Sequence, residues 1–395
     1  MLHYTRRVKN KALLTLSSYL LFFLVGYFIN IGGAVTSALA QDLAATTATI
    51  GYCFSLFMIG RFIGIIANGI FMKRPLVDKK YYVRIAPVLI VLAIGGLWLS
   101  RSAAVLAFFL LLAGIGIGGI YSTSNMILVD LYEGKRKAFH ITMINFLYSV
   151  GGVSSPFIAG LMLKNGYSWK YAYALFAALL ITALILTIRA NFRDLYSERP
   201  HEARDTGTMN APLRFICASI VLYIMAEFSF TYWTPVYMRE ALGKDPLFAG
   251  AAVSAFWIAV LIGRFLAGFA LQHIRPRLYV LASGLLGIAS LLSLWILRGD
   301  TSMLLACFLS GLFLSGLFPA IFTLGTDMSE SLKRSFPTFM MLSAATGSFL
   351  AMPVGSVVKG IVGVEQMLLI PVMALGGMCL LIVLSARRRG RPARV

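Results

Sequence analysis

The sequence predicts an all-α, polytopic membrane protein with twelve transmembrane helices, and three observations lead to this fold class. Of the 395 residues, 59% are hydrophobic and only 13% are charged, whereas a soluble domain carries about 25% charged residues. Apolar stretches long enough to cross a bilayer recur along the whole chain. Lysine and arginine concentrate in every second loop, as they do in chains that thread a membrane repeatedly. The runs are continuous, which argues against the alternating pattern of a transmembrane β-barrel.

Each expected span is an apolar stretch bounded by short polar breaks. The expected spans are 12–38, 46–72, 81–100, 102–131, 139–164, 169–189, 213–240, 246–272, 277–297, 301–326, 333–360 and 364–385. The first is too long for a signal-peptide core, so we expect it to remain as a helix.

The basic residues set the expected orientation. Of the 35 lysines and arginines, 26 lie in the tails and even-numbered loops, seven lie in the odd-numbered loops, and Arg61 and Arg264 lie inside spans. The positive-inside rule then places both termini in the cytoplasm of a multi-pass protein of the cytoplasmic (inner) membrane. Despite the net charge of +20, we expect the basic loops to contact anionic lipid and not nucleic acid.

The reactive side chains form no constellation for catalysis or metal binding. The four cysteines stand singly in apolar stretches, and the four histidines are scattered over tails and loop ends. The chain lacks a phosphate-binding loop, a nucleophile motif and metal-ligand spacing. We therefore expect no metal, no cofactor and no enzymatic activity, and transport would have to draw on a gradient and not on ATP.

Two internal repeats indicate a duplicated design. Ile59-Gly-Arg-Phe62 recurs as Ile262-Gly-Arg-Phe265, and the pattern Asp-x2-Glu-x2-basic-basic-x-Phe begins at both Asp130 and Asp327. The longest polar stretch lies between the halves. The repeats predict an N-terminal six-helix bundle over 1–189, a cytoplasmic linker over 190–212, and a C-terminal six-helix bundle with a basic tail over 213–395.

This design resembles the major facilitator superfamily over nearly the whole chain. Within it, Tyr223-x3-Glu227-x5-Trp233-x3-Tyr237, followed by Gly263-Arg264-Phe265 in the next span, is similar to the fucose/glucose permease-like family, including its TsgA-like branch. The resemblance implies two pseudo-symmetric bundles and transport by alternating access. In the loop after the second span, Lys73 stands where the superfamily's motif has an aspartate, so that aspartate is absent, and Arg74 follows it.

Charged residues near the cytoplasmic ends of spans are candidates for an inward gate. Lys73 or Arg74 would pair with Asp130, and Asp327 is the repeat of Asp130. The alternative is that the two aspartates only support helix ends and topology. Either interpretation requires a cationic partner, because a carboxylate at a helix C-terminus opposes the helix dipole.

Glu227 is the clearest candidate for coupling ion movement to transport. A charged side chain inside the bilayer costs at least about 2.5 kcal/mol, so such a residue usually has a functional or structural role. Glu227 would carry a proton or cation or bind substrate, or else serve as a structural carboxylate held by Arg264 or a hydroxyl. Arg61 and Arg264 would anchor an anionic or polyhydroxylated substrate. The alternative for both arginines, which we favour from the sequence, is a structural pair near the cytoplasmic ends of their spans.

Polar and aromatic residues at mid-depth are candidates for lining a substrate cavity, because amides bind hydroxyls and aromatic faces stack on sugar rings. Each of them has an alternative role in interhelical hydrogen bonding or packing. The candidates are Tyr27, Asn30, Asn125, Asn145, Tyr148, Trp233 and Trp257.

The sequence therefore favours a secondary active transporter of a small polar solute, a sugar or related metabolite, driven by protons or another ion. An exporter of drugs, siderophores or metabolites by proton antiport is the alternative in mechanism. A non-transporting receptor or scaffold is the alternative in class, although the short external loops argue against it. We expect the protein to act as a monomer.

Overall fold

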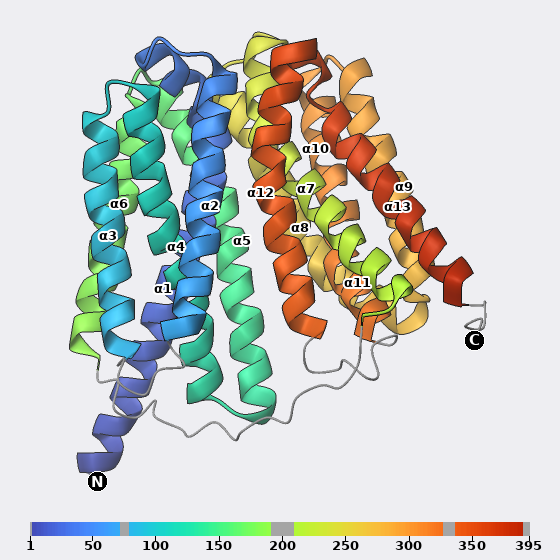
Figure 1. The fold of residues 1–395 in the computed structure, drawn as a ribbon. Helices are drawn as coiled ribbons and strands as arrows, with labels where there is room; N and C mark the ends of the chain where they lie inside the picture. The colour runs from blue at the N-terminus through green and yellow to red at the C-terminus, as the bar shows by residue number, and fades with distance from the viewer. Residues whose placement is uncertain (1, 72–78, 191–208, 327–335, 390–395) are drawn as a thin grey trace. The chain divides into compact units, whose positions relative to one another are not determined.

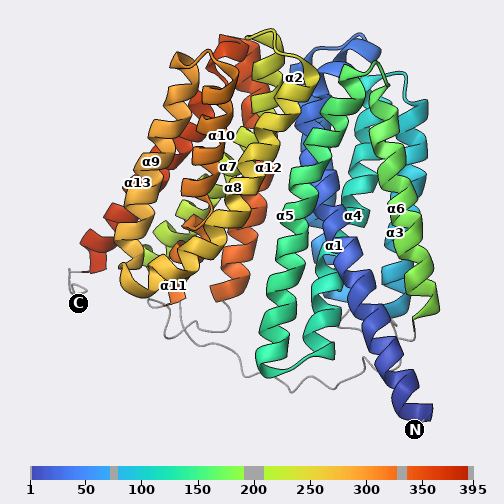
Figure 2. The same cartoon turned by 180° about the vertical axis from the view of Figure 1, so that it is seen from behind.

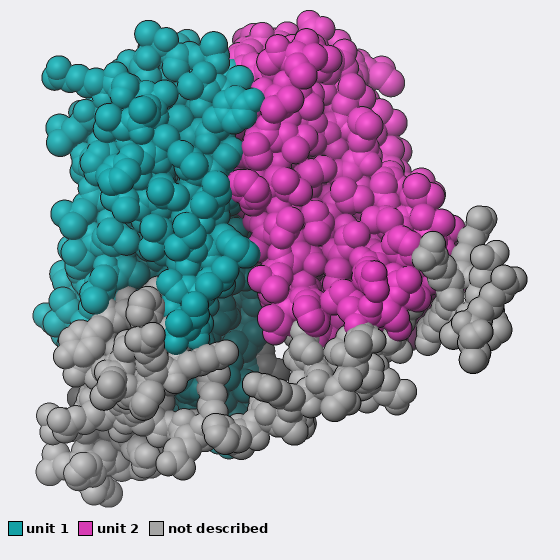
Figure 3. Space-filling view, viewed as in Figure 1, with its two compact units in different colours: residues 1–200 teal, residues 201–395 magenta. Residues whose placement is uncertain are grey.

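The computed structural model describes residues 2–71, 79–190, 209–326 and 336–389. All regular elements in these ranges are helices. The chain divides into two compact units, residues Met1–Pro200 and His201–Val395, which are coloured separately in Figure 3. The expected linker 190–212 spans the junction between them, and most of it lies outside the described residues.

The first unit contains six long helices that run side by side (Figure 1). They agree with the expected spans within a few residues, except that the first and fifth helices begin earlier. The helices are α1 (Leu2–Asp42), α2 (Thr47–Phe71), α3 (Lys79–Leu99), α4 (Ala103–Leu131), α5 (Gly134–Lys164) and α6 (Trp169–Arg189).

The second unit contains the remaining helices, which Figure 2 shows from behind. They are α7 (Ala211–Glu240), α8 (Pro246–His273), α9 (Pro276–Ile296), α10 (Asp300–Leu314), α11 (Leu317–Thr326), α12 (Phe336–Val362), the short 3-10 helix η3 (Val364–Gln366) and α13 (Leu369–Arg389).

The expected span 301–326 is divided into α10 and α11, with the break at Ser315 and Gly316. Pro319 explains the break, because it has no N–H to donate to the carbonyl of Ser315 and its ring clashes with that carbonyl. The side chain of Tyr279 packs on the break, where a Cβ at Gly316 would lie only 2.1 Å from its hydroxyl oxygen. The division leaves the number of crossings unchanged.

The predicted fold class is confirmed. Among the described residues, eleven helical stretches are long and apolar enough to cross a membrane, counting Asp300–Thr326 as one, and Val83–Leu99 is a shorter apolar helix. Together they make the twelve expected spans. Two caps mark where the second unit's first spans begin, because the side chains of Asn210 and Asp245 accept hydrogen bonds from the third residue of α7 and α8.

Glycines allow pairs of helices to approach until backbones touch. In the first unit, a Cβ on Gly114 of α4 would lie 2.2 Å from the carbonyl oxygen of Phe57 on α2. A Cβ on Gly151 of α5 would lie 2.2 Å from the carbonyl oxygen of Phe23 on α1. The second unit repeats both contacts, at Gly311 against Phe256 and at Gly347 against Val221.

These glycine contacts show which residues of the first unit are structurally equivalent to which residues of the second. Gly64 meets the carbonyl oxygen of Ile115, and Gly263 meets that of Leu312, so Gly263 corresponds to Gly64 and not to Gly60. The repeat that matches Ile59–Phe62 with Ile262–Phe265 implies that Arg61 and Arg264 are equivalent positions, and the structure shows that this match is shifted by one helical turn. Gly60 and Gly64 lie one helical turn apart on α2, so a short sequence match can align either of them with Gly263.

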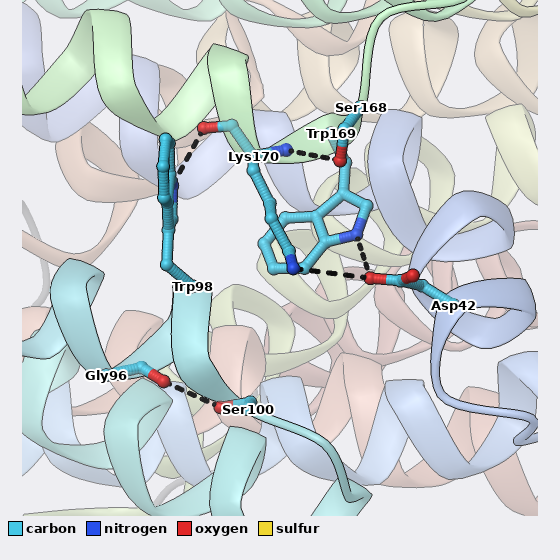
Figure 4. A network of polar contacts seen from close by, with 7 residues as sticks. All are labelled: Asp42, Gly96, Trp98, Ser100, Ser168, Trp169 and Lys170. Carbon is cyan, nitrogen blue, oxygen red and sulfur yellow. Dashed lines mark hydrogen bonds and ion pairs between the residues drawn. The ribbon is translucent and has the colours of Figure 1, made fainter.

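Polar contacts hold α1, α3 and α6 together at one end of the first unit (Figure 4). The Asp42 carboxylate accepts a hydrogen bond from Nε1 of Trp169 at 3.0 Å and lies 3.8 Å from Nζ of Lys170. Nε1 of Trp98 donates to the carbonyl oxygen of Lys170 at 3.1 Å. The network joins helices from three parts of the unit and stabilises the scaffold.

Candidate functional site

Glu227 lies in the middle of α7, sixteen residues after its first residue and thirteen before its last. Its side chain is buried, with 5% exposure. The hydroxyl of Tyr223, one turn earlier on the same helix, donates a short hydrogen bond to its Oε2. Every other acidic residue that the structure describes lies near a helix end or in a loop. Glu227 is thus the one mid-helix carboxylate of the described chain.

Arg264 supplies the positive charge for this carboxylate. From α8, it acts electrostatically on both Glu227 and Tyr223, and Tyr279 on α9 also acts on Tyr223. We call Tyr223, Glu227, Arg264 and Tyr279 the carboxylate cluster. The structure therefore places Glu227 within electrostatic range of Arg264, the partner that the sequence analysis proposed for it. A buried carboxylate held by a hydroxyl and a nearby cation can exist in charged and protonated forms.

The two candidate tryptophans of the second unit are fully buried. Trp233 is 0% exposed, and its Nε1 donates to the carbonyl oxygen of Ala351 on α12 at 3.4 Å. Its ring lies directly against Gly355, where a Cβ would be 1.9 Å from Nε1. Trp257 is 1% exposed and contacts the ring of Phe256 edge-on at 5.8 Å. This geometry favours the packing interpretation for Trp233.

In the first unit, Arg61 lies beside aromatic rings. Its guanidinium carbon is 5.3 Å from the ring centroid of Tyr121 on α4. Tyr121 stacks on Phe22 of α1 at 5.0 Å, and Phe22 lies 6.0 Å from the ring of Tyr148 on α5. We call Arg61, Phe22, Tyr121 and Tyr148 the basic-aromatic cluster. It joins side chains from four of the unit's six helices.

The three candidate asparagines share one arrangement. Nδ2 of each donates to the carbonyl oxygen four residues earlier on its own helix: Asn30 to Gly26 at 2.8 Å, Asn125 to Tyr121 at 3.1 Å, and Asn145 to Ile141 at 2.8 Å. Asn30 is buried, Asn125 is half-buried and Asn145 is exposed. An amide used this way keeps its oxygen as an acceptor.

Tyr27 is 1% exposed, and its hydroxyl lies 3.4 Å from the carbonyl oxygen of Ala172 on α6. Its ring packs at 5.9 Å from that of Phe176. This tyrosine therefore connects α1 to α6 inside the first unit. The geometry favours its structural interpretation over contact with a ligand.

The predicted gate is described only in part. Asp130 is the second-to-last residue of α4 and is half-buried. Lys73, Arg74 and Asp327 lie outside the described residues. The gate stays a prediction.

The sequence interpretation missed a polar cluster where α1, α4 and α5 meet. The hydroxyl of Tyr19 lies 2.5 Å from Nδ1 of His140, and the imidazole stacks on Tyr132 at 3.6 Å. Thr15 lies 2.8 Å from the hydroxyl of Tyr132, and Nζ of Lys11 lies 4.3 Å from that ring. The available signal was the spacing of Lys11, Thr15 and Tyr19, which at four-residue intervals share one face of α1.

The chain matches the sequence model of the Major Facilitator Superfamily over residues 15–330 and again over 216–395. It is 25% identical to Protein TsgA of Salmonella arizonae over 365 residues, which cover 91% of each chain. It is also 25% identical over 346 residues, 86% of each chain, to Protein TsgA of Salmonella schwarzengrund. These matches confirm the resemblance to the TsgA-like branch.

Solved structures share the fold. A mutant of the nucleoside transporter NupG has a TM-score of 0.78 at 14% identity, covering 96% of this chain and 99% of that one. A bacterial homologue of the human lysosomal transporter Spinster, in an inward-facing and occupied conformation, has a TM-score of 0.76 at 16% identity and coverage of 98% and 99%. A D-xylose-proton symporter has a TM-score of 0.71 at 15% identity and coverage of 94% and 96%.

Proposed function

The chain belongs to the Major Facilitator Superfamily, and we propose that it is a proton-coupled secondary transporter that moves a small polar solute by alternating access. The superfamily consists of transporters and not of enzymes, so the expectation of no enzymatic activity is confirmed. The proposal adds the coupling ion and the class of solute.

The observation that carries the proposal is the carboxylate cluster. A proton-coupled transporter needs a group inside the membrane that takes up and releases a proton during the cycle. Glu227 is placed for this role, because it lies at mid-helix with a hydroxyl donor on one side and Arg264 nearby. In the charged form, it is stabilised by both neighbours. Protonation removes its attraction for Arg264, which gives the second unit two electrostatic states.

Two further features support the proposal. A protein with this fold is named as a D-xylose-proton symporter, so the fold accommodates proton-driven uptake of a polar solute. The concentration of basic residues in alternate loops supports a cytoplasmic membrane location with both termini inside. In this arrangement, Asp130 would pair with Lys73 or Arg74 at an inward gate, and 190–212 would link the two moving bundles.

The test uses purified protein in liposomes that contain a pH-sensitive dye. Glucose, glucuronate, lactate and uridine are added outside in turn, without a pre-set gradient. Symport predicts that at least one solute acidifies the lumen and that Glu227→Gln abolishes this acidification. Glu365→Gln is the matched control, because Glu365 is exposed in η3 at the very beginning of the last span and not at mid-helix.

The sign of the pH change separates the mechanisms. Alkalinisation of the lumen on solute entry would indicate antiport, the mechanism expected of an exporter. Acidification that is equal in the wild type and in Glu227→Gln would contradict coupling through this carboxylate. A receptor or scaffold would move neither solute nor protons.

A further inference from the structure

Arg61 lies deep in the first unit. It precedes the last residue of α2 by ten positions, about 15 Å along a helix that rises 1.5 Å per residue. The backbone of α4 lies directly behind it, because a Cβ on Gly118 would be 2.1 Å from the carbonyl oxygen of Arg61. The Arg61 side chain is half-buried.

The guanidinium has no carboxylate partner among the described residues of its unit. The acidic residues that the structure describes there are Asp42, Asp130 and Glu133, and all three lie at helix ends. Asp130 follows Tyr121 by nine positions on α4, which is about 13.5 Å along the helix. Arg264 of the second unit, by contrast, has Glu227 nearby. The two arginines therefore differ in their surroundings, because only Arg264 has a carboxylate nearby in its own unit.

Within the described part of the chain, Arg61 also lacks a neutral acceptor. Its Nε is buried without a hydrogen-bond partner, and no hydrogen bond joins its guanidinium to a described residue. The face of Tyr121 offers a cation–π contact at 5.3 Å, which attracts the charge but accepts none of the five N–H donors in the usual way. Arg61 is half-buried, and its buried Nε donor has no acceptor, which is costly. An acceptor from outside the protein that bonds Nε and the neighbouring N–H groups would therefore be bound favourably.

We propose that Arg61 binds a carboxylate group of the transported solute, which makes that solute a small hydroxylated organic acid such as a sugar acid. The inference rests on the proposed transport function and names its substrate class. Carboxylates are the preferred partners of a guanidinium, through charge-assisted hydrogen bonds. Asn125 lies one turn from Tyr121 on the same face of α4, where its amide oxygen can accept a hydrogen bond from a solute hydroxyl.

The test compares two solutes that share a ring but differ in charge, glucuronate and glucose. Binding to the purified protein is measured by isothermal calorimetry and by the rise in its melting temperature, without any gradient. The wild type should bind glucuronate at least tenfold more tightly than glucose. Arg61→Gln should abolish this preference, and Arg101→Gln, at an exposed loop position, should retain it.

Arg61→Lys guards against a folding defect in the glutamine variant, because it keeps the charge and loses only the planar fork. It should retain part of the preference for glucuronate. The proposal is overturned if the wild type binds the two solutes equally or binds neither. It is also overturned if Arg61→Gln keeps the preference.

Failure of this proposal and failure of the transport function give different results. If the protein transports glucose with protons but does not bind glucuronate, the transport function is supported and the carboxylate site at Arg61 is contradicted. If the protein binds glucuronate through Arg61 but transports neither the acid nor protons, the carboxylate site is supported and the transport function is contradicted.

Discussion

Substituting alanine for Gly118 tests the packing that holds Arg61 in place. Its new Cβ would lie 2.1 Å from the carbonyl oxygen of Arg61 and 3.0 Å from the backbone nitrogen of Ile65. The first distance is about 1.3 Å short of ordinary contact at 3.4 Å. The obstacle is backbone and not a side chain that can rotate, so α2 must move away from α4.

The expected change in the free energy of unfolding for Gly118→Ala is the sum of two opposing effects. Forcing an extra methyl group into a well-packed interface costs about 1–3 kcal/mol. Alanine is favoured over glycine within a helix by about 0.5–1 kcal/mol, which offsets part of that cost. Because the contact is with backbone, we expect a net loss of about 1–2 kcal/mol in the free energy of unfolding.

The control is Gly95→Ala on α3, where a Cβ would meet nothing within 4 Å. This variant should be as stable as the wild type or more stable by up to about 1 kcal/mol. Unfolding would be followed by circular dichroism during titration of detergent micelles with sodium dodecyl sulfate. Equal stability of the two variants would refute the proposed backbone contact between α2 and α4.

Three further substitutions test other parts of the structure by the same unfolding titration. Asn68 is 0% exposed, and neither of its amide atoms has a partner among the described residues, so Asn68→Leu should stabilise the protein by about 1–3 kcal/mol; a loss of stability would point to a partner for this amide. Trp169→Phe removes the indole donor to Asp42 and should cost about 1 kcal/mol. Lys170→Met removes a half-exposed ion pair with Asp42 and a distant cation–π contact with Trp169, and it should cost no more than about 0.5 kcal/mol. A larger loss than in Trp169→Phe would show that the lysine contacts stabilise the protein more than the indole hydrogen bond does.

The fold was predictable from the sequence because the bilayer imposes it. Each span must satisfy its backbone hydrogen bonds internally, so length and hydropathy alone locate the helices. The division at Ser315 and Gly316 was missed because hydropathy does not register it. Pro319 was the available signal, through the carbonyl four residues earlier.

The candidate site was predictable only where a residue was out of place in a membrane. Glu227 and the two arginines stood out because charges inside spans are costly. The surroundings of these residues depend on which helix faces contact one another, and the sequence carries little information on that. Tyr121 and His140 were missed for this reason, and Arg61 and Arg264 were matched as equivalent positions from a short sequence match.

Transport by the Glu227→Gln variant tests most directly the claim that Glu227 couples proton movement to solute transport. In proteoliposomes, counterflow exchanges labelled for unlabelled solute and requires no proton movement, whereas uphill accumulation under a proton gradient requires coupling. The account predicts that Glu227→Gln retains counterflow and loses accumulation. Undiminished uphill accumulation by this variant would contradict it.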